Sequence, residues 1–149
     1  MLYFAGMARE AQLTLLSRFE NIELAEHALL ELGGDAAVDE ETLYWVGMAL
    51  REAVANAIKH GNKLSADKRV FVTMKLESEG QMRLVVEDEG SGFDTAQIGD
   101  PTSPENLLRS SGRGVFYMRS FMDQVNFVPG ERGGTRIELT KQLSVGRKT

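Results

Sequence analysis

The chain has 149 residues, of which 42% are hydrophobic and 26% are charged, and its formal net charge is -5 at pH 7. This length suits a single compact domain over residues 1–149, with frayed ends near residues 1–10 and 142–149. The acidic balance and the absence of a long basic run disfavour nucleic acid and anionic membranes as partners. The chain has no cysteine and two histidines, which excludes disulfides, thiolate zinc sites and cysteine nucleophiles and disfavours a histidine-rich metal site.

The amino-terminal stretch MLYFAGMAREAQLTLL has neither a positively charged leader nor a long apolar core. We therefore do not expect a secretion signal. No stretch of the chain approaches the ~20 apolar residues that a membrane-spanning helix needs. These features predict a cytoplasmic protein without a membrane partner.

The first half of the chain predicts one strand and two helices. Residues 12–19 favour a strand, and residues 21–34 carry apolar residues at helical spacing before a Gly-Gly stop. Residues 39–63 begin with three acids, which suit a helix amino terminus, and continue with apolar residues at helical spacing. This second helix is expected to be long and to end near Gly61.

The second half predicts a largely antiparallel sheet. Residues 69–77 and 81–88 alternate apolar and polar side chains on either side of a glycine-containing turn, which is typical of a hairpin. Residues 114–122 indicate a short helix, and residues 124–128 and 133–141 indicate two more strands. The expected fold is an α+β two-layer sandwich, in which helices cover one face of a mixed, mostly antiparallel sheet.

A long segment without regular structure separates these elements. Residues 95–112 contain two prolines, two glycines and several small polar residues, which predict a loop with a single helical turn at most. Loops of this length in compact domains are usually functional or disordered.

Glu52 and Asn56 form the first candidate for chemistry. They are four residues apart on the predicted long helix, so both side chains project from one face about one turn apart. Such a pair could hold Mg²⁺ through the amide oxygen while the carboxylate deprotonates a nucleophile. Taken alone, the pair is more simply explained as an ordinary solvent-exposed helix face.

Asp88 ends a predicted strand and is followed by Gly90 and Gly92. A carboxylate at this position could accept a hydrogen bond from an exocyclic amine, and the glycines leave the backbone open to a flat ligand. The simpler alternative is a glycine turn after a strand.

Two further glycine motifs follow. Gly112 and Gly114 open a predicted helix, where free N–H groups and the helix dipole favour an anion such as phosphate. Thr135, preceded by a glycine, begins the last strand, where its hydroxyl could bind a ligand or simply suit a β position. Neither motif matches the P-loop or the complete dinucleotide fingerprint.

The four motifs together, in this order, resemble the GHKL superfamily of Bergerat-fold ATP-binding proteins. The corresponding stretches are EAVANAIKHGNK, VEDEGSGFD, SGRGVFYM and GGTRIEL. The resemblance extends from the first predicted strand to about residue 141. It implies a Bergerat-type sandwich that binds ATP and Mg²⁺, with residues 95–112 as the ATP lid.

The resemblance also implies a role for each candidate residue. Asn56 would bind Mg²⁺ between the ATP phosphates, and Asp88 would receive the adenine amino group. Glu52 would be the general base of phosphoryl transfer. The remaining nucleotide-contacting residues would be Gly90 and Gly92 beside adenine and ribose, Thr135 beside Asp88, and Gly112 and Gly114 at the phosphate end of the lid. Arg109 would reach the γ-phosphate, unless it is a solvated loop residue.

Within the superfamily, the size of the chain and the stretches NAIKHGN and RSSGRGVFYMRSFMDQV are similar to bacterial anti-sigma-factor serine kinases. This resemblance implies a homodimer that binds a sigma factor and phosphorylates a STAS-type anti-sigma-factor antagonist. The expected contact surface for a sigma factor or a second copy is the first strand and helix. The aromatic residues at helix or strand spacing are interpreted as core or interface residues: Tyr44, Trp45, Phe116, Tyr117, Phe121 and Phe127.

Two alternatives stay open at this point. The chain could be a binding module that ATP gates without phosphoryl transfer. It could also be a detached catalytic domain of a sensor histidine kinase, which would transfer phosphate to a histidine of another chain. The two histidines of this chain are not well placed to be that acceptor.

Overall fold

The computed structural model describes residues 9–77, 79–90 and 112–143. The described strands form one sheet in the order β1-β2-β3-β5-β4, and each pairing between them is antiparallel. The strands are β1 (Arg9–Leu16), β2 (Arg69–Leu76), β3 (Gln81–Asp88), β4 (Gln124–Pro129) and β5 (Thr135–Gln142). The predicted hairpin is β2–β3, and its turn contains Gly80 at a positive φ of 88°.

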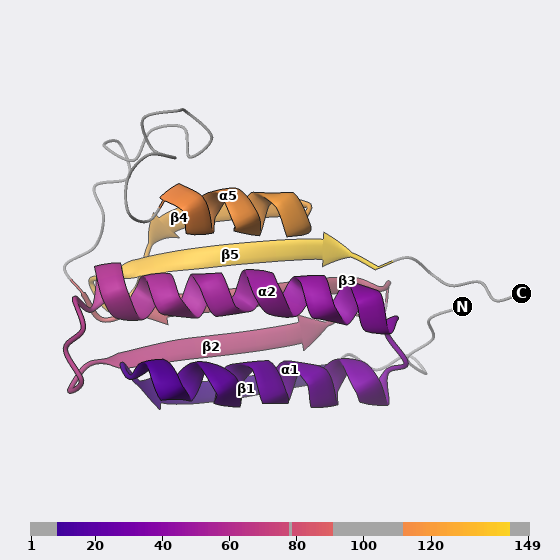
Figure 1. Cartoon of the computed structure of the whole chain (residues 1–149), viewed down its shortest axis with the longest axis horizontal. Helices are drawn as coiled ribbons and strands as arrows, with labels where there is room; N and C mark the ends of the chain where they lie inside the picture. The colour runs from indigo at the N-terminus through magenta and orange to yellow at the C-terminus, as the bar shows by residue number, and fades with distance from the viewer. Residues whose placement is uncertain (1–8, 78, 91–111, 144–149) are drawn as a thin grey trace, which may run out of the picture.

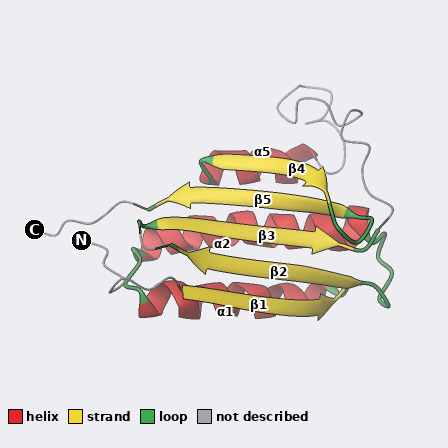
Figure 2. Ribbon diagram, turned by 180° about the vertical axis from the view of Figure 1, so that it is seen from behind, coloured by secondary structure: helices red, strands yellow, loops and turns green. Residues whose placement is uncertain are grey.

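The helices lie in a single layer against one face of this sheet (Figure 1). They are η1 (Phe19–Asn21), α1 (Ile22–Asp35), α2 (Glu40–Asn56), η2 (Ala57–Gly61) and α5 (Gly112–Phe121). Figure 2 shows the opposite face of the sheet, which no described helix covers. The predicted two-layer α+β class is therefore confirmed, and within the described ranges the sheet has no parallel pairing.

The alternation of side chains along β3 places an acid in the core-facing layer. Met82, Leu84 and Val86 are fully buried beneath the helices, and the next residue on that side is Asp88. Glu87 points to the uncovered face, because successive side chains of a strand alternate. The alternation that buries this row of hydrophobic side chains therefore places the Asp88 carboxyl group at the end of the core.

The long helix α2 forms the centre of the helical layer. Its start is capped by Asp39, whose side chain accepts a hydrogen bond from the Thr42 N–H at 3.0 Å. After Asn56 the chain widens into the π-helical turn η2, in which the Asn62 N–H donates to the Ala57 carbonyl at 2.7 Å. Single π turns of this kind often occur at functional sites.

Several element boundaries differ from the sequence prediction. The first strand ends at Leu16 rather than at 19, because the chain turns there into η1 after pairing all eight β1 residues with β2. Helix α1 continues through the Gly-Gly pair, since Gly33 packs against the Leu43 side chain and leaves no room for a Cβ atom. Helix α5 starts at Gly112, two residues earlier than predicted.

Candidate functional site

Asp88 is the buried polar group at the centre of the site. Only 1% of its surface is exposed, and its Oδ1 accepts hydrogen bonds from the N–H groups of Gly90 at 2.9 Å and Thr135 at 3.2 Å. Burial raises the pKa of the Asp88 carboxyl, and the two hydrogen bonds offset this effect only in part. The structure thus brings together Asp88, Gly90 and Thr135, the three residues that the resemblance assigned to the adenine end of the nucleotide.

Three glycines pack tightly around this carboxyl group, and we call Gly61, Gly90 and Gly134 the glycine cluster. A Cβ atom added to Gly61 or to Gly134 would overlap the Asp88 carboxylate, and one added to Gly90 would overlap the Gly61 carbonyl. The cluster joins the end of η2, the end of β3 and the start of β5. The sequence predicted Gly61 only as a helix end, and its contact with Asp88 was missed.

Glu52 and Asn56 lie on the α2 face that approaches the start of α5. Asn56 is 8% exposed and Glu52 is half-buried, and neither side chain has a hydrogen-bond or ion-pair partner among the described residues. A Cβ atom on Gly114 would lie 2.8 Å from Glu52 Oε1, so the first turn of α5 rests against this carboxylate. The predicted base and the predicted phosphate-binding helix end are therefore neighbours.

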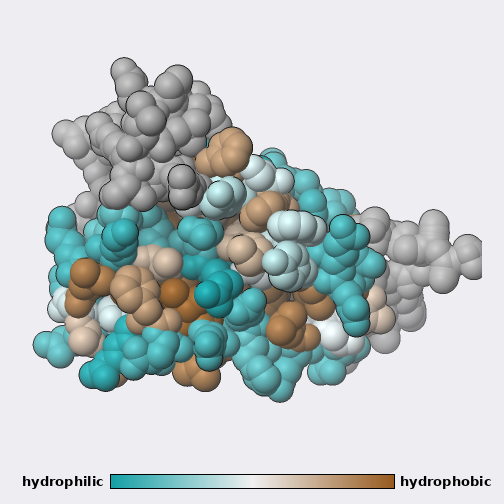
Figure 3. Space-filling model, viewed as in Figure 1, coloured by the Kyte–Doolittle hydropathy of each residue, from teal (hydrophilic) through white to brown (hydrophobic). Residues whose placement is uncertain are grey.

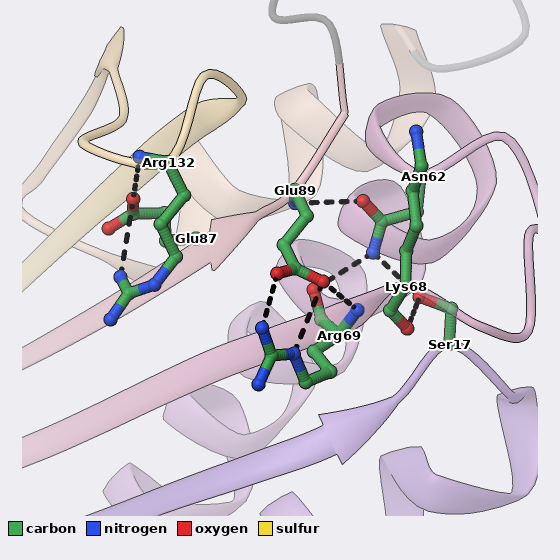
Figure 4. Close-up of polar contacts among 7 residues, drawn as sticks. All are labelled: Ser17, Asn62, Lys68, Arg69, Glu87, Glu89 and Arg132. Atoms are coloured by element: carbon green, nitrogen blue, oxygen red, sulfur yellow. Dashed lines mark hydrogen bonds and ion pairs between the residues drawn. The ribbon is translucent and has the colours of Figure 1, made fainter.

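Asn62 holds the backbone just after the end of β3, at Glu89, as Figure 4 shows. This residue is 1% exposed, and its amide donates to Ser17 Oγ at 2.6 Å and to the Arg69 carbonyl at 3.0 Å. Its oxygen accepts from the Glu89 N–H at 2.8 Å. One side chain thereby connects the residue after β1, the start of β2 and the residue after β3. The sequence analysis missed this role, because a single asparagine after a helix carries no distinguishing signal.

Glu87 holds the turn between β4 and β5 from the uncovered face of the sheet. Glu87 is 4% exposed, and its Oε2 accepts from the Arg132 N–H at 3.2 Å and lies 3.5 Å from the guanidinium Nη1 (Figure 4). The Arg132 guanidinium carbon lies 3.8 Å from the centre of the Phe71 ring. Asp88 accepts a hydrogen bond from the N–H of Thr135, at the start of β5, on the other face of the sheet. The adjacent β3 residues Glu87 and Asp88 therefore hold the β4–β5 turn, one from each face.

With this geometry in view, we compared the chain with known proteins. A model of the histidine kinase-like ATPase domain matches residues 15–141. The chain belongs to this family. An anti-sigma F factor of Bacillus cereus is 36% identical over 137 residues, which cover 89% of this chain and 90% of the relative. An anti-sigma F factor of Bacillus thuringiensis is 40% identical over 108 residues, which cover 70% of this chain and 72% of the relative.

Solved structures of the family share the fold at low sequence identity. The structure of the RsbU and RsbW domains of a Mycobacterium tuberculosis protein has a TM-score of 0.67 at 20% identity, covering 91% of this chain and 32% of that chain. A blue-light activated histidine kinase domain of Erythrobacter litoralis has a TM-score of 0.56 at 21% identity, covering 85% and 61%. The predicted GHKL membership and resemblance to anti-sigma-factor kinases are confirmed.

The residues fit a magnesium ion that is held mainly by a nucleotide. In the described ranges, no group of three or more His, Cys, Asp or Glu side chains could hold a metal ion. Mg²⁺ commonly takes one or two protein oxygens together with substrate phosphates and water. The Asn56 amide, largely buried and without a hydrogen-bond partner in the described structure, suits such a role.

Some predicted contacts cannot be placed. Gly92, Arg109 and the predicted lid at 95–112 lie outside the described residues, apart from Gly112 at the start of α5. Gly112 and Gly114 do open a helix, as predicted. None of the helices in the described ranges is long and apolar enough to cross a membrane.

Proposed function

We propose that the chain is an ATP-dependent serine/threonine-protein kinase that acts as an anti-sigma factor and phosphorylates a STAS-type antagonist. The observation that carries the proposal is the position of Glu52, one helical turn from Asn56 and against the first turn of α5. The anti-sigma F factor names of the relatives support the regulatory part of the proposal. We further propose that the protein works in the cytoplasm as a homodimer.

In this proposal adenine lies beside Gly90, and Asp88 accepts a hydrogen bond from its amino group. Gly90 and Gly134 let the backbone close around the carboxyl group, because a Cβ atom on either would overlap the Gly61 carbonyl or Asp88 itself. Thr135 is held beside Asp88 by its own N–H bond to Oδ1. The resemblance to the GHKL superfamily assigns Gly92 to the same part of the nucleotide, the adenine and ribose.

The phosphates lie toward the α5 end of the site. The N–H groups at the start of α5, at Gly112 and Gly114, face the phosphates, and Arg109 binds the γ-phosphate. Asn56 holds Mg²⁺ through its amide oxygen, and the ion offsets phosphate charge when it is bound.

Glu52 acts on the protein substrate. Its carboxylate takes the proton of the serine hydroxyl as the hydroxyl oxygen attacks the γ-phosphorus, and the bond from that phosphorus to the β–γ bridging oxygen of ATP breaks. The products are phosphoserine and ADP. The proximity of Glu52 to the helix end supports this assignment, because base, phosphate site and nucleophile must lie within a few ångströms of one another.

The test uses γ-phosphate-labelled ATP, Mg²⁺ and a purified STAS-type antagonist. Glu52→Gln should abolish label transfer and leave ATP affinity nearly unchanged, whereas the exposed Glu79→Gln control in the turn between β2 and β3 should leave both intact. The labelled product should resist acid, as phosphoserine does. Full transfer by the Glu52 variant would refute the base assignment. If neither the wild type nor the variants transfer the label although they bind ATP, the result would favour an ATP-gated binding module. An acid-labile product would favour a histidine kinase domain.

A further inference from the structure

Five aromatic rings form a continuous row on the helical layer, which we call the aromatic ribbon. Tyr44 and Trp45 come from α2, and Phe116, Tyr117 and Phe121 come from α5. Neighbouring ring centroids are 4.9 Å apart for Tyr44–Trp45 and Trp45–Phe121, 6.1 Å for Tyr117–Phe121 and 5.9 Å for Phe116–Tyr117. The rings therefore cover the junction of two helices that pack against each other.

Most of this ribbon is exposed and is not needed to build the core. The exposed fractions are 58% for Tyr44, 49% for Phe116, 40% for Trp45 and 39% for Tyr117. Figure 3 shows this face of the molecule, where hydrophobic side chains lie among hydrophilic ones over the helices. Single exposed apolar residues are common, but a contiguous aromatic patch usually marks a binding surface. Tyrosine and tryptophan are also the residues that most often anchor protein interfaces.

The charges beside the ribbon are negative at its α2 end. Glu40 and Glu41 are exposed and precede Tyr44 and Trp45 by four residues, so each carboxylate lies one turn from a ring on the same side of the helix. Neither forms an ion pair within the described part of the chain. Helix α1, which packs against α2, carries four acids and no lysine or arginine. Aromatic faces and unpaired carboxylates together attract a cationic side chain.

The ribbon begins away from the proposed catalytic end of α2. Trp45 precedes Glu52 by seven residues, which corresponds to about 10 Å along the helix axis. The α5 end with Phe121 contacts Trp45, and the opposite end with Gly114 contacts Glu52. The Tyr44–Trp45 end can therefore accept a partner without occupying the space beside Glu52.

From these observations we propose that the aromatic ribbon binds an amphipathic helix of a partner protein. The apolar face of that helix lies along the rings, and a lysine or arginine at one end lies over Tyr44 and Trp45 beside Glu40 and Glu41. A helix suits the surface because its apolar residues recur along one face, and a row of rings offers matching contacts. The inference does not require phosphoryl transfer by the chain.

Trp45 is the only tryptophan of the sequence and reports directly on the ribbon. The probe is a synthetic helical peptide of about five turns, with leucines on one face, lysines at one end and no aromatic residue. Its matched control carries glutamates in place of the lysines. We expect the lysine peptide to shift the Trp45 emission to the blue and to bind about tenfold or more tightly than the glutamate peptide.

Variants of the full-length chain locate the binding. Tyr44→Ser and Phe116→Ser should each weaken the lysine peptide about tenfold or more, whereas Phe19→Ser, which alters another half-exposed ring outside the ribbon, should have no effect. Equal binding of the two peptides, unchanged binding by the ribbon variants, or no emission change would overturn the proposal. Sedimentation velocity tests whether a second copy of the chain binds the ribbon. Self-association that Tyr44→Ser abolishes would assign the ribbon to a second copy and would overturn the proposal.

Discussion

Replacing Asp88 by asparagine is expected to stabilise the nucleotide-free protein while it damages the proposed ligand site. Asparagine keeps an oxygen that can accept from the Gly90 and Thr135 N–H groups, and it removes the charge. Because burial raises the pKa of this carboxyl group, its ionised form is less stable in the folded chain than in the unfolded chain. The neutral amide avoids that cost.

The size of the effect follows from linkage between proton binding and folding. Each pKa unit by which the folded state departs from the unfolded state corresponds to about 1.4 kcal/mol. We expect Asp88→Asn to raise the unfolding free energy by on the order of 1 kcal/mol at neutral pH. Removing the buried charge raises this free energy, and the weaker hydrogen bonds of a neutral acceptor offset part of the gain. With an unfolding entropy of about 2.1 cal/mol/K per residue, this gain raises Tm by about 3 °C.

The sign of the pH dependence distinguishes this explanation from a general packing effect. A raised pKa means that the folded state holds the Asp88 proton at a pH where the unfolded state has released it. The contribution of Asp88 to the stability of the wild type therefore falls as pH rises from the ordinary value of 3.8 through the raised value, and then levels off. Asp88→Asn lacks this loss, so its advantage over the wild type should grow with pH.

Urea unfolding followed by Trp45 fluorescence, from about pH 4 to about pH 8, measures the difference between the two proteins. The exposed Asp67→Asn is the matched control and should unfold like the wild type at each pH. An Asp88→Asn variant that is less stable than the wild type, or whose gain in unfolding free energy does not change with pH, would show that ionisation of the buried Asp88 carboxyl group does not lower stability.

Three further predictions concern the residues that hold the site together. Asn62→Ala should lower the unfolding free energy by about 2–3 kcal/mol in urea titrations, because it leaves Ser17 Oγ, the Arg69 carbonyl and the Glu89 N–H without this hydrogen-bond partner; a loss below the error of the titration would show that water replaces the amide. Gly61→Ala should abolish ATP binding and destabilise the fold, since its Cβ overlaps Asp88, whereas Gly34→Ala has open space and should leave calorimetric binding unchanged. Arg132→Ala should weaken ATP binding several-fold, because it removes the guanidinium contact with Glu87 and leaves only the main-chain N–H bond to hold the β4–β5 turn, and Arg132→Lys should restore part of the affinity; equal affinities in all three proteins would contradict this positioning role.

Local pattern accounts for much of the fold. The alternation along β2 and β3 predicted the hairpin and the buried side of each strand, and the acids at 39–41 predicted the start of α2. The Gly-Gly stop in α1 was wrong, because the contact between Gly33 and Leu43 makes a glycine favourable inside that helix. Such a contact depends on how two helices pack, which spacing within one helix does not encode.

The site was partly predictable for the same reason. Motif order suggested Glu52, Asn56 and Asp88 as partners. The structure places Glu52 and Asn56 in the last turn of α2 and Asp88 at the end of β3, against Gly61 of the turn that continues α2. The residues that support them were not predictable, because their contacts join distant parts of the chain. Glu87 and Arg132, for example, are 45 residues apart in sequence, and their pairing arises only once β3 and β5 are neighbours.

The most direct test of the account is calorimetric titration of the wild type and Asp88→Asn with ATP, with and without Mg²⁺. We predict that the wild type binds ATP, that Mg²⁺ tightens the binding, and that Asp88→Asn loses at least most of the affinity although it remains folded. A folded wild-type protein that binds no ATP, or an Asp88→Asn variant that binds ATP as tightly as the wild type, would contradict the central claim.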